Sequence, residues 1–261
     1  MLKYFNIYIL IGVLLLFPFV YNSNSDEYEK RYSAFINNEA ICHVGYGYVP
    51  QKIEKCSEVF LGVPYKSNTL IGSKDTKEKF VINLDGMDCF TYIDYVHSLV
   101  LSHDYYDFVD NLKLARYRNG IVSFETRNHF FYDWSLNVKG IQDITKRIRK
   151  NKVTTVRKFL NMKSGGSVFL EGIPIRAVEI SYIKAKFITP VYLKKIHSGA
   201  YVGIYTEKEG LDVSHVGILI KEDGKYYFRH ASSIEGKVVD IDFLEYIKDK
   251  PGIIVYSSYK Q

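Results

Sequence analysis

The stretch "NLDGMDCFTYIDYVHSLVL", residues 83–101, places Cys89 between an acidic turn and a helical pattern. Its apolar residues recur about every 3.6 residues, which predicts a helix over 89–101 with one buried face: Phe90, Ile93, Val96 and residues 99–101. Asp88 is the candidate N-cap. A cysteine in the first turn has its thiolate favoured by unpaired N–H groups and by the helix dipole. The stretch therefore indicates a nucleophile at Cys89, and a buried structural cysteine is the alternative.

The composition is that of a globular protein. The chain has 261 residues, 47% of them hydrophobic and 25% charged, which is enough for one sizeable core. Basic residues are scattered, and "KRIRK" at 146–150 is the one dense cluster, so no nucleic-acid-binding stripe is expected. The mild positive charge suits a polyanionic cell envelope. The cysteine and histidine spacings match no metal site, so we expect no metal and no cofactor.

The first 25 residues resemble a targeting segment. An early lysine is followed by an apolar run from Ile7 to Val20 and then by an Asn/Ser stretch. This pattern predicts a signal peptide or an N-terminal membrane anchor, followed by a single domain over 26–261. Export to the periplasm or cell envelope is expected either way, with membrane contact only through this segment if it stays uncleaved. In such a compartment Cys42 and Cys56 are the pair that could form a disulfide.

The rest of the chain divides into a helical half and a strand-rich half. Helices are expected over 28–38, 52–60, 104–115 and 140–160, a strand pair around the Asn119–Gly120 turn, and short strands from residue 200 onward. The order predicts an α+β fold built around one antiparallel sheet.

Two histidines lie in "GLDVSHVGILIKEDGKYYFRHASS", residues 210–233. The "EDGK" turn predicts a hairpin in which His215 and His230 fall at the same end, where cross-strand neighbours lie about 5 Å apart. A thiol nucleophile needs a base and a third group that orients the base, and Cys89, His215 and His230 supply these three. The alternative is that both are ordinary strand histidines.

Three of these segments carry a family resemblance. "LGVPYKSN", "MDCFTYID" and "SHVGILI" with "RHASS" resemble motifs of NlpC-type papain-like cell-wall hydrolases. With "ARYRNG" and "TRNHFFYDWSLNVKG", they resemble most closely the N-acetylmuramoyl-L-alanine amidase-like branch, long described as a domain of unknown function. The matching stretches span residues 58–258.

The resemblance implies a papain-like fold in which the helix bearing the nucleophile packs on an antiparallel sheet. It implies Cys89 as the nucleophile, His215 as the general base and His230 as the orienting residue. It also implies that the Tyr65 hydroxyl faces the thiol and helps the Cys89 N–H to hold the oxyanion.

The segment "TRNHFFYDW", residues 126–134, is the expected substrate wall. Arg127 could pair with a peptide or lactyl carboxylate, and His129, Asp133 and Trp134 could line the wall. The alternative is an aromatic-rich loop that caps the core. Asp88 could contact substrate as well as cap the helix.

The predicted function is therefore an exported cysteine hydrolase whose partner is peptidoglycan or a muropeptide. The resemblance implies cleavage of the amide between N-acetylmuramic acid and L-alanine. Alternatives are a stem-peptide endopeptidase of the same fold, a non-catalytic wall-binding module, and lipid acyl transfer by the same three residues.

Overall fold

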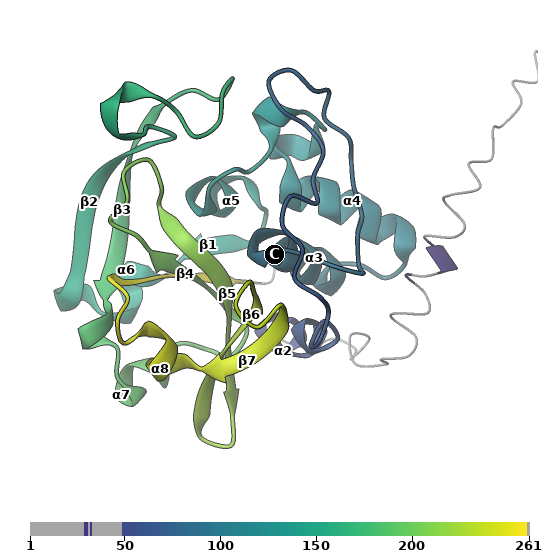
Figure 1. Ribbon diagram of the computed structural model, residues 1–261. Coiled ribbons are helices and arrows are strands. Elements are labelled where there is room, and N and C mark those ends of the chain that lie inside the picture. Colours follow the sequence, from purple (N-terminus) through teal and green to yellow (C-terminus); the bar gives the residue numbers. More distant parts are fainter. Residues whose placement is uncertain (1–28, 31, 33–48, 260–261) are drawn as a thin grey trace, which may run out of the picture.

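The computed structural model describes residues 29–30, 32 and 49–259 (Figure 1). The N-terminal segment, Cys42 and most of the helix expected over 28–38 lie outside these residues, so the Cys42–Cys56 disulfide stays a prediction. None of the helices within the described part is long and apolar enough to cross a membrane.

Seven α-helices and eight strands form the described chain. The helices are α2 (Val49–Glu58), α3 (Cys89–Val100), α4 (Tyr105–Arg116), α5 (Phe131–Asn137), α6 (Thr145–Ile148), α7 (Pro190–Leu193) and α8 (Phe243–Ile247). The strands are β1 (Ile141–Asp143), β2 (Val153–Leu160), β3 (Arg176–Lys184), β4 (Ala200–Tyr205), β5 (Val213–Glu222), β6 (Lys225–Ser232), β7 (Lys237–Asp242) and β8 (Gly252–Ser258). Short 3₁₀ turns connect them: η1 (Arg118–Gly120), η2 (Phe124–Thr126), η3 (Lys150–Lys152), η4 (Ser164–Gly166) and η5 (Ala185–Phe187).

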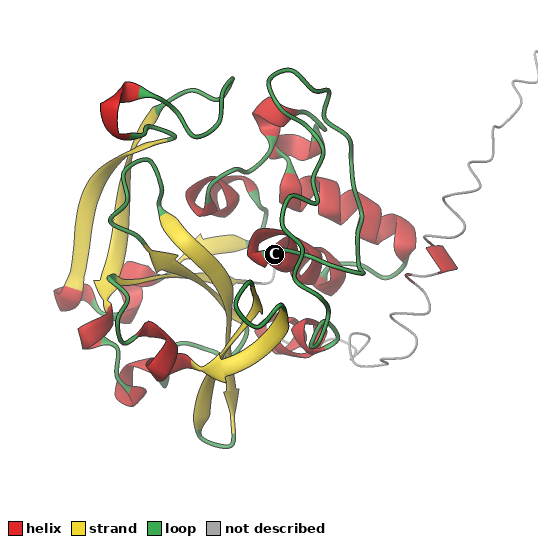
Figure 2. Cartoon of the chain, viewed as in Figure 1, coloured by secondary structure: helices red, strands yellow, loops and turns green. Residues whose placement is uncertain are grey.

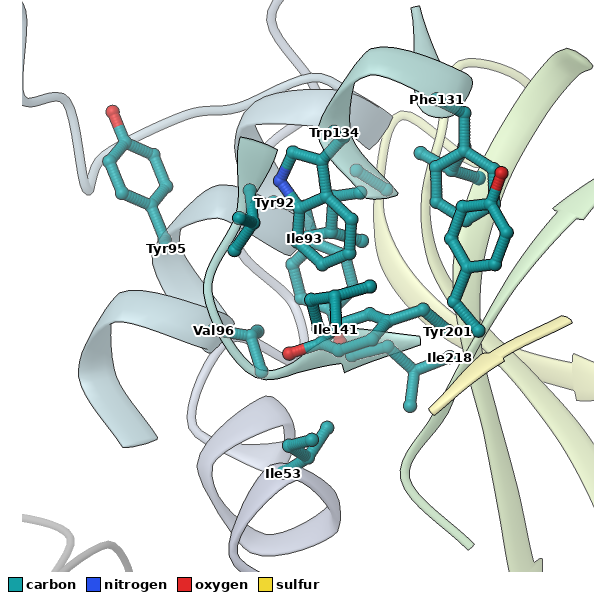
Figure 3. Packing of buried hydrophobic residues seen from close by; sticks show 14 of the residues in the cluster. Ile53, Tyr92, Ile93, Tyr95, Val96, Phe131, Trp134, Ile141, Tyr201 and Ile218 are labelled. Atoms are coloured by element: carbon teal, nitrogen blue, oxygen red, sulfur yellow. The ribbon is translucent and has the colours of Figure 1, made fainter. Parts of the chain in front are cut away.

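The strands make one antiparallel sheet in the order β2-β3-β8-β4-β5-β6-β7, and β1 pairs with β8. Helices α3, α4 and α5 gather beside one part of this sheet (Figure 2). Side chains of α3 and α5 meet Tyr201 and Ile218 of the sheet in the larger of two cores (Figure 3). The second core lies on the opposite face, where Leu219 and Phe228 meet Phe243 of α8. The mixed helix and sheet architecture expected from the sequence is confirmed.

Helix α3 begins where the sequence predicts. The Asp88 carboxylate accepts hydrogen bonds from the N–H groups of Phe90 (3.1 Å) and Thr91 (2.8 Å), and the Thr91 hydroxyl accepts one from the Asp88 N–H (3.0 Å). This reciprocal capping box satisfies N–H groups that the first turn leaves unpaired. Every residue from 91 to 100 is buried, so α3 is the central helix of the larger core.

The β5–β6 hairpin is also confirmed. Asp223 and Gly224 both have positive φ (48° and 77°), and the flanking residues Glu222 and Lys225 are paired. Two successive residues with positive φ give the turn whose twist matches that of the strands it joins. The hairpin therefore fixes which β5 and β6 residues share a face.

Two expectations for the middle of the chain are wrong. Residues 140–160 form β1, α6, η3 and β2 instead of a helix, because the β-branched run 153–156 favours a strand and pairs with β3. Around Asn119 the chain forms η1, η2 and α5 instead of a strand pair, and a single bridge joins Tyr117 to Arg127. Here the Ser123 side chain accepts a hydrogen bond from the Thr126 N–H, which favours a local turn over a ladder.

Candidate active site

The Cys89 thiol lies at the first residue of α3, against β5. Burial, followed by the neighbouring Asp88 carboxylate, raises its pKa to about 12, although hydrogen bonds from the N–H groups of Val216, Cys89 and Phe90 oppose the shift. The Val216 contact places the sulfur beside the residue that follows His215. At neutral pH the resting group is therefore a thiol rather than a thiolate.

The two predicted histidines meet at one end of the β5–β6 hairpin. His215 Nε2 lies 2.6 Å from His230 Nδ1, and the two rings are nearly perpendicular. A β-bulge opposite Ile204 and Tyr205 leaves Ser214 unpaired directly before His215. Bulges of this kind redirect a strand and often lie beside active sites. The hydrogen bond to His230 occupies Nε2, so Nδ1 is the His215 ring atom left for a reaction.

Aromatic rings hold this histidine pair. The Phe228 ring stacks on His230 (4.8 Å between centroids), and Tyr246 of α8 contacts both His230 (5.1 Å) and His215 (6.3 Å). A Cβ on Gly217 would lie 2.6 Å from the Phe228 ring, so glycine is needed there for Phe228 to reach this position.

Burial keeps the histidine pair neutral. It lowers the pKa of His215 to about 3, with further contributions from His230 and Lys250, and that of His230 to about 4. Neutral imidazole is the form that can accept a proton from a thiol.

Tyr65 lies in the same site. A bridge pairs it with Met87, two residues before Cys89, and its N–H donates to the Gly236 carbonyl in the β6–β7 turn (2.8 Å). Burial raises the pKa of its phenol, followed by the charges of Cys89 and Asp88. The structure therefore places Tyr65 near Cys89, and the Cys89 sulfur at Val216, the residue that follows His215.

Asp88 caps α3, as described above, and also lines a cleft of about 470 Å³, together with Thr69, Arg127 and Phe169. Its position thus fits both roles considered for it.

Arg127 lines that cleft, but its guanidinium is already paired. Its Nε donates to Glu78 Oε1 (3.0 Å) and its Nη2 donates to the other carboxylate oxygen. Glu78 is buried and also accepts a hydrogen bond from the Tyr117 hydroxyl (2.8 Å). The bidentate edge expected to bind a substrate carboxylate is therefore occupied by a carboxylate of the protein itself.

The other residues of the expected substrate wall are engaged by partners within the protein. Trp134 is fully buried in the larger core and donates to Asp94 Oδ1 (3.1 Å), so the expectation that it lines a wall is wrong (Figure 3). Asp133 accepts two hydrogen bonds from Arg176 (2.5 and 2.7 Å), and His129 Nε2 lies 2.7 Å from the Phe124 carbonyl. Burial lowers the pKa of His129 to about 4. The segment caps the core, which was the alternative interpretation.

Two structural features near the site have no local signal in the sequence. Tyr246 and Lys250 line a cavity of about 320 Å³ that His215 and His230 also border. Asp94 of α3 forms a fully buried ion pair with Arg116 of α4 (3.2 Å). Neither could be found from a local pattern, because the partners are distant in sequence. Within the described residues, no cluster of three or more His, Cys, Asp or Glu could hold a metal ion.

Comparison with known proteins identifies the family. The sequence profile of the N-acetylmuramoyl-L-alanine amidase-like (AmiA-like) family matches residues 55–253, a range that contains all four site residues. The chain belongs to this family. No curated protein matches the sequence.

Solved structures show the same fold. An N-acetylmuramoyl-L-alanine amidase from Bacteroides uniformis is 28% identical, with a TM-score of 0.67 over 80% of this chain and 99% of that one. A Legionella pneumophila protein from a family of unknown function is 24% identical, with a TM-score of 0.75 over 92% of this chain and 97% of that one, and this likeness concerns the fold alone. The family and the amidase neighbour support an amidase-like hydrolase.

Proposed function

We propose that this protein is an exported cysteine hydrolase of peptidoglycan, with an NlpC-type papain-like fold, that cleaves the amide between N-acetylmuramic acid and L-alanine. The contact of 2.6 Å between His215 Nε2 and His230 Nδ1, with the Cys89 sulfur hydrogen-bonded to the N–H of Val216 next to His215, is the observation that carries the proposal. Family membership supports the substrate class, and the amidase neighbour supports the bond.

The reaction begins from neutral groups. Cys89 Sγ attacks the lactyl carbonyl carbon while its proton passes to His215 Nδ1, and His230 holds the imidazolium through the Nε2–H of His215. The Cys89 N–H and the Tyr65 hydroxyl stabilise the oxyanion, a contribution of roughly 3–4 kcal/mol for one such donor in other hydrolases.

Collapse of the tetrahedral intermediate breaks the C–N bond. The proton on His215 passes to the leaving nitrogen of L-alanine, and the lactyl group stays on Cys89 as a thioester. Water then attacks this thioester while His215 accepts its proton, and return of that proton to the sulfur regenerates the thiol.

The test is mass spectrometry of a defined muropeptide digested by the full chain or by its Cys89→Ala variant. A free stem peptide that begins with L-alanine, formed only by the unmutated chain, is the expected product. A cut inside the stem would keep the chemistry of Cys89 but identify a stem-peptide endopeptidase. If neither protein cuts any of several wall chemistries, while thermal melts show both folded, the protein is a wall-binding module or acts on another acyl substrate.

A further inference from the structure

A group of cations converges at the end of α6, around two aromatic rings. Arg149 lies over the rings of Tyr192 (3.8 Å) and Phe187 (5.7 Å), and its Nη1 donates to the Phe187 carbonyl (2.8 Å). Lys152 and Lys186 lie over the same Phe187 ring (4.8 and 5.3 Å), and Lys195 lies over Tyr192 (5.8 Å). We call these four cations with Phe187 and Tyr192 the basic face.

The basic face brings like charges together without acidic partners. Three of its cations, Arg149, Lys152 and Lys186, surround the Phe187 ring. They are close enough to repel one another, because physiological salt screens charges only over roughly 8–10 Å. Among the described residues, no Asp or Glu forms an ion pair with any of the four. "KRIRK", the one dense basic cluster of the sequence, leads directly into this face. An external anion would relieve the repulsion that the fold leaves uncompensated.

An exposed apolar side chain belongs to the same short helix as Tyr192. Val191 of α7 is 68% exposed and directly precedes Tyr192 in the sequence, and Phe187 is partly exposed. Cations around an exposed apolar side chain suit the interface of an anionic bilayer, where phosphates meet the charges and the apolar groups enter the headgroup region. A soluble polyanion would use the charges but not Val191.

We propose that the basic face docks on the surface of a bilayer that contains anionic lipids. Figure 1 shows α6 and α7 at the same end of the molecule, and the contacts of Arg149 with Phe187 and Tyr192 join these segments. The sequence also carries the apolar run from Ile7 to Val20. Stable attachment to a membrane generally needs two weak membrane-binding elements. The basic face would supply the second element in addition to this apolar run.

Docking by this face leaves the candidate active site free. The turn end of the β5–β6 hairpin contacts α7, because the Tyr226 hydroxyl donates to the Pro190 carbonyl and Lys221 Nζ to the Lys194 carbonyl (both 3.2 Å). His215 lies six residues from Lys221 along β5, about 20 Å at roughly 3.3 Å per strand residue. The contact between the hairpin and α7 is therefore well separated from the histidine pair.

The test measures binding of the full chain to sedimented vesicles of phosphatidylcholine alone or with phosphatidylglycerol. The neutral vesicles report the contribution of the N-terminal segment, so the ratio of the two affinities isolates the anionic contribution. The test variant is Lys152→Gln/Lys186→Gln/Lys195→Gln. The control variant, Lys77→Gln/Lys79→Gln/Lys139→Gln, removes the same charge from exposed positions elsewhere.

We expect the ratio of the two affinities to fall about a hundredfold in the test variant, because each lysine near an anionic surface contributes about 1 kcal/mol. In the control variant the ratio should change little. Soluble muropeptide cleavage should be unchanged in both, which separates this proposal from the catalytic one. An unchanged ratio in the test variant, or an equal loss in the control variant, would overturn the proposal. The proposal would also be overturned if the test variant lost binding to soluble polyphosphate but kept its binding to anionic vesicles, since the partner would then be an anionic polymer.

Discussion

The two halves of the candidate site are held in opposite ways. Cys89 stands on a helix that is fixed by buried charge, through the ion pair of Asp94 with Arg116 and the hydrogen bond from Trp134. His215 and His230 stand on a hairpin that is fixed by backbone pairing and by the packed rings of Phe228 and Tyr246.

This difference determines how each half fails. Removing one partner of a buried ion pair leaves the other charged and unsolvated, so the loss falls on the stability of the whole fold. Trimming a ring beside the histidines leaves the sheet ladder intact, so the loss falls on the orientation of the imidazoles and hence on catalysis. The comparison predicts that damage on the helix side appears in unfolding and damage on the hairpin side in rate.

The largest effect is expected from His215→Ala, which removes the proposed general base from the hairpin side of the site. Without an acceptor for the thiol proton, muropeptide cleavage should fall by about 10²–10⁴-fold, while the melting temperature stays close to that of the parent chain. Steady-state cleavage rates and thermal melts check both parts. A variant with nearly full activity would remove His215 from the mechanism.

Arg116→Met tests the helix half. Leaving Asp94 buried and unpaired should cost about 3–5 kcal/mol of the free energy of unfolding, measured by urea denaturation. The control is Lys55→Met at the pair with Glu58 of α2, where both side chains are exposed (54% and 43%), so that the expected cost is about 0–1 kcal/mol. Equal losses in the two variants would contradict the contrast between the halves.

Tyr246 allows a finer test of the hairpin half. Tyr246→Leu removes the ring that packs on both histidines and should lower the cleavage rate by about 10–100-fold, with little change in stability. Tyr246→Phe keeps the ring and should retain most of the activity. If the phenylalanine variant is as slow as the leucine variant, the hydroxyl rather than the packing is what matters.

The smallest effect is expected from Asp88→Asn. Asparagine caps a helix nearly as well as aspartate, so stability should hold, while loss of the carboxylate lowers the pKa of Cys89. Because the native thiol has a pKa of about 12, its alkylation by iodoacetamide should still be rising with pH above neutrality. The variant should react a few-fold faster at a given pH. A native rate that is already flat below pH 7 would indicate a preformed thiolate and imidazolium instead.

Much of the candidate site could be predicted because its signals are local. The capping box of α3 lies within four residues, and the Asp223–Gly224 turn sets the register of the hairpin. From the register alone, His215 and His230 must share a face and an end of the sheet.

The predictions that failed concern residues whose partners lie far along the chain. Arg127 is engaged by Glu78, 49 residues away, and Trp134 by Asp94, 40 residues away, so neither is available for the substrate role its type suggested. Strand β2 was mistaken for helix because its pairing with β3 is decided across the sheet. Tyr246 went unnoticed because only the folded chain brings α8 against β6.

The protonated resting state of Cys89 also bears on chemical durability. Peroxides attack the thiolate, and sulfenic acid forms fastest at exposed thiols of low pKa. A thiol that is partly buried and kept protonated mainly by that burial, with the Asp88 carboxylate adding to the effect, should therefore oxidise slowly while no substrate is bound. The packing at the start of α3, together with the aspartate that caps it, thus also protects the nucleophile, which makes it reactive only when a substrate carbonyl and a base are both present.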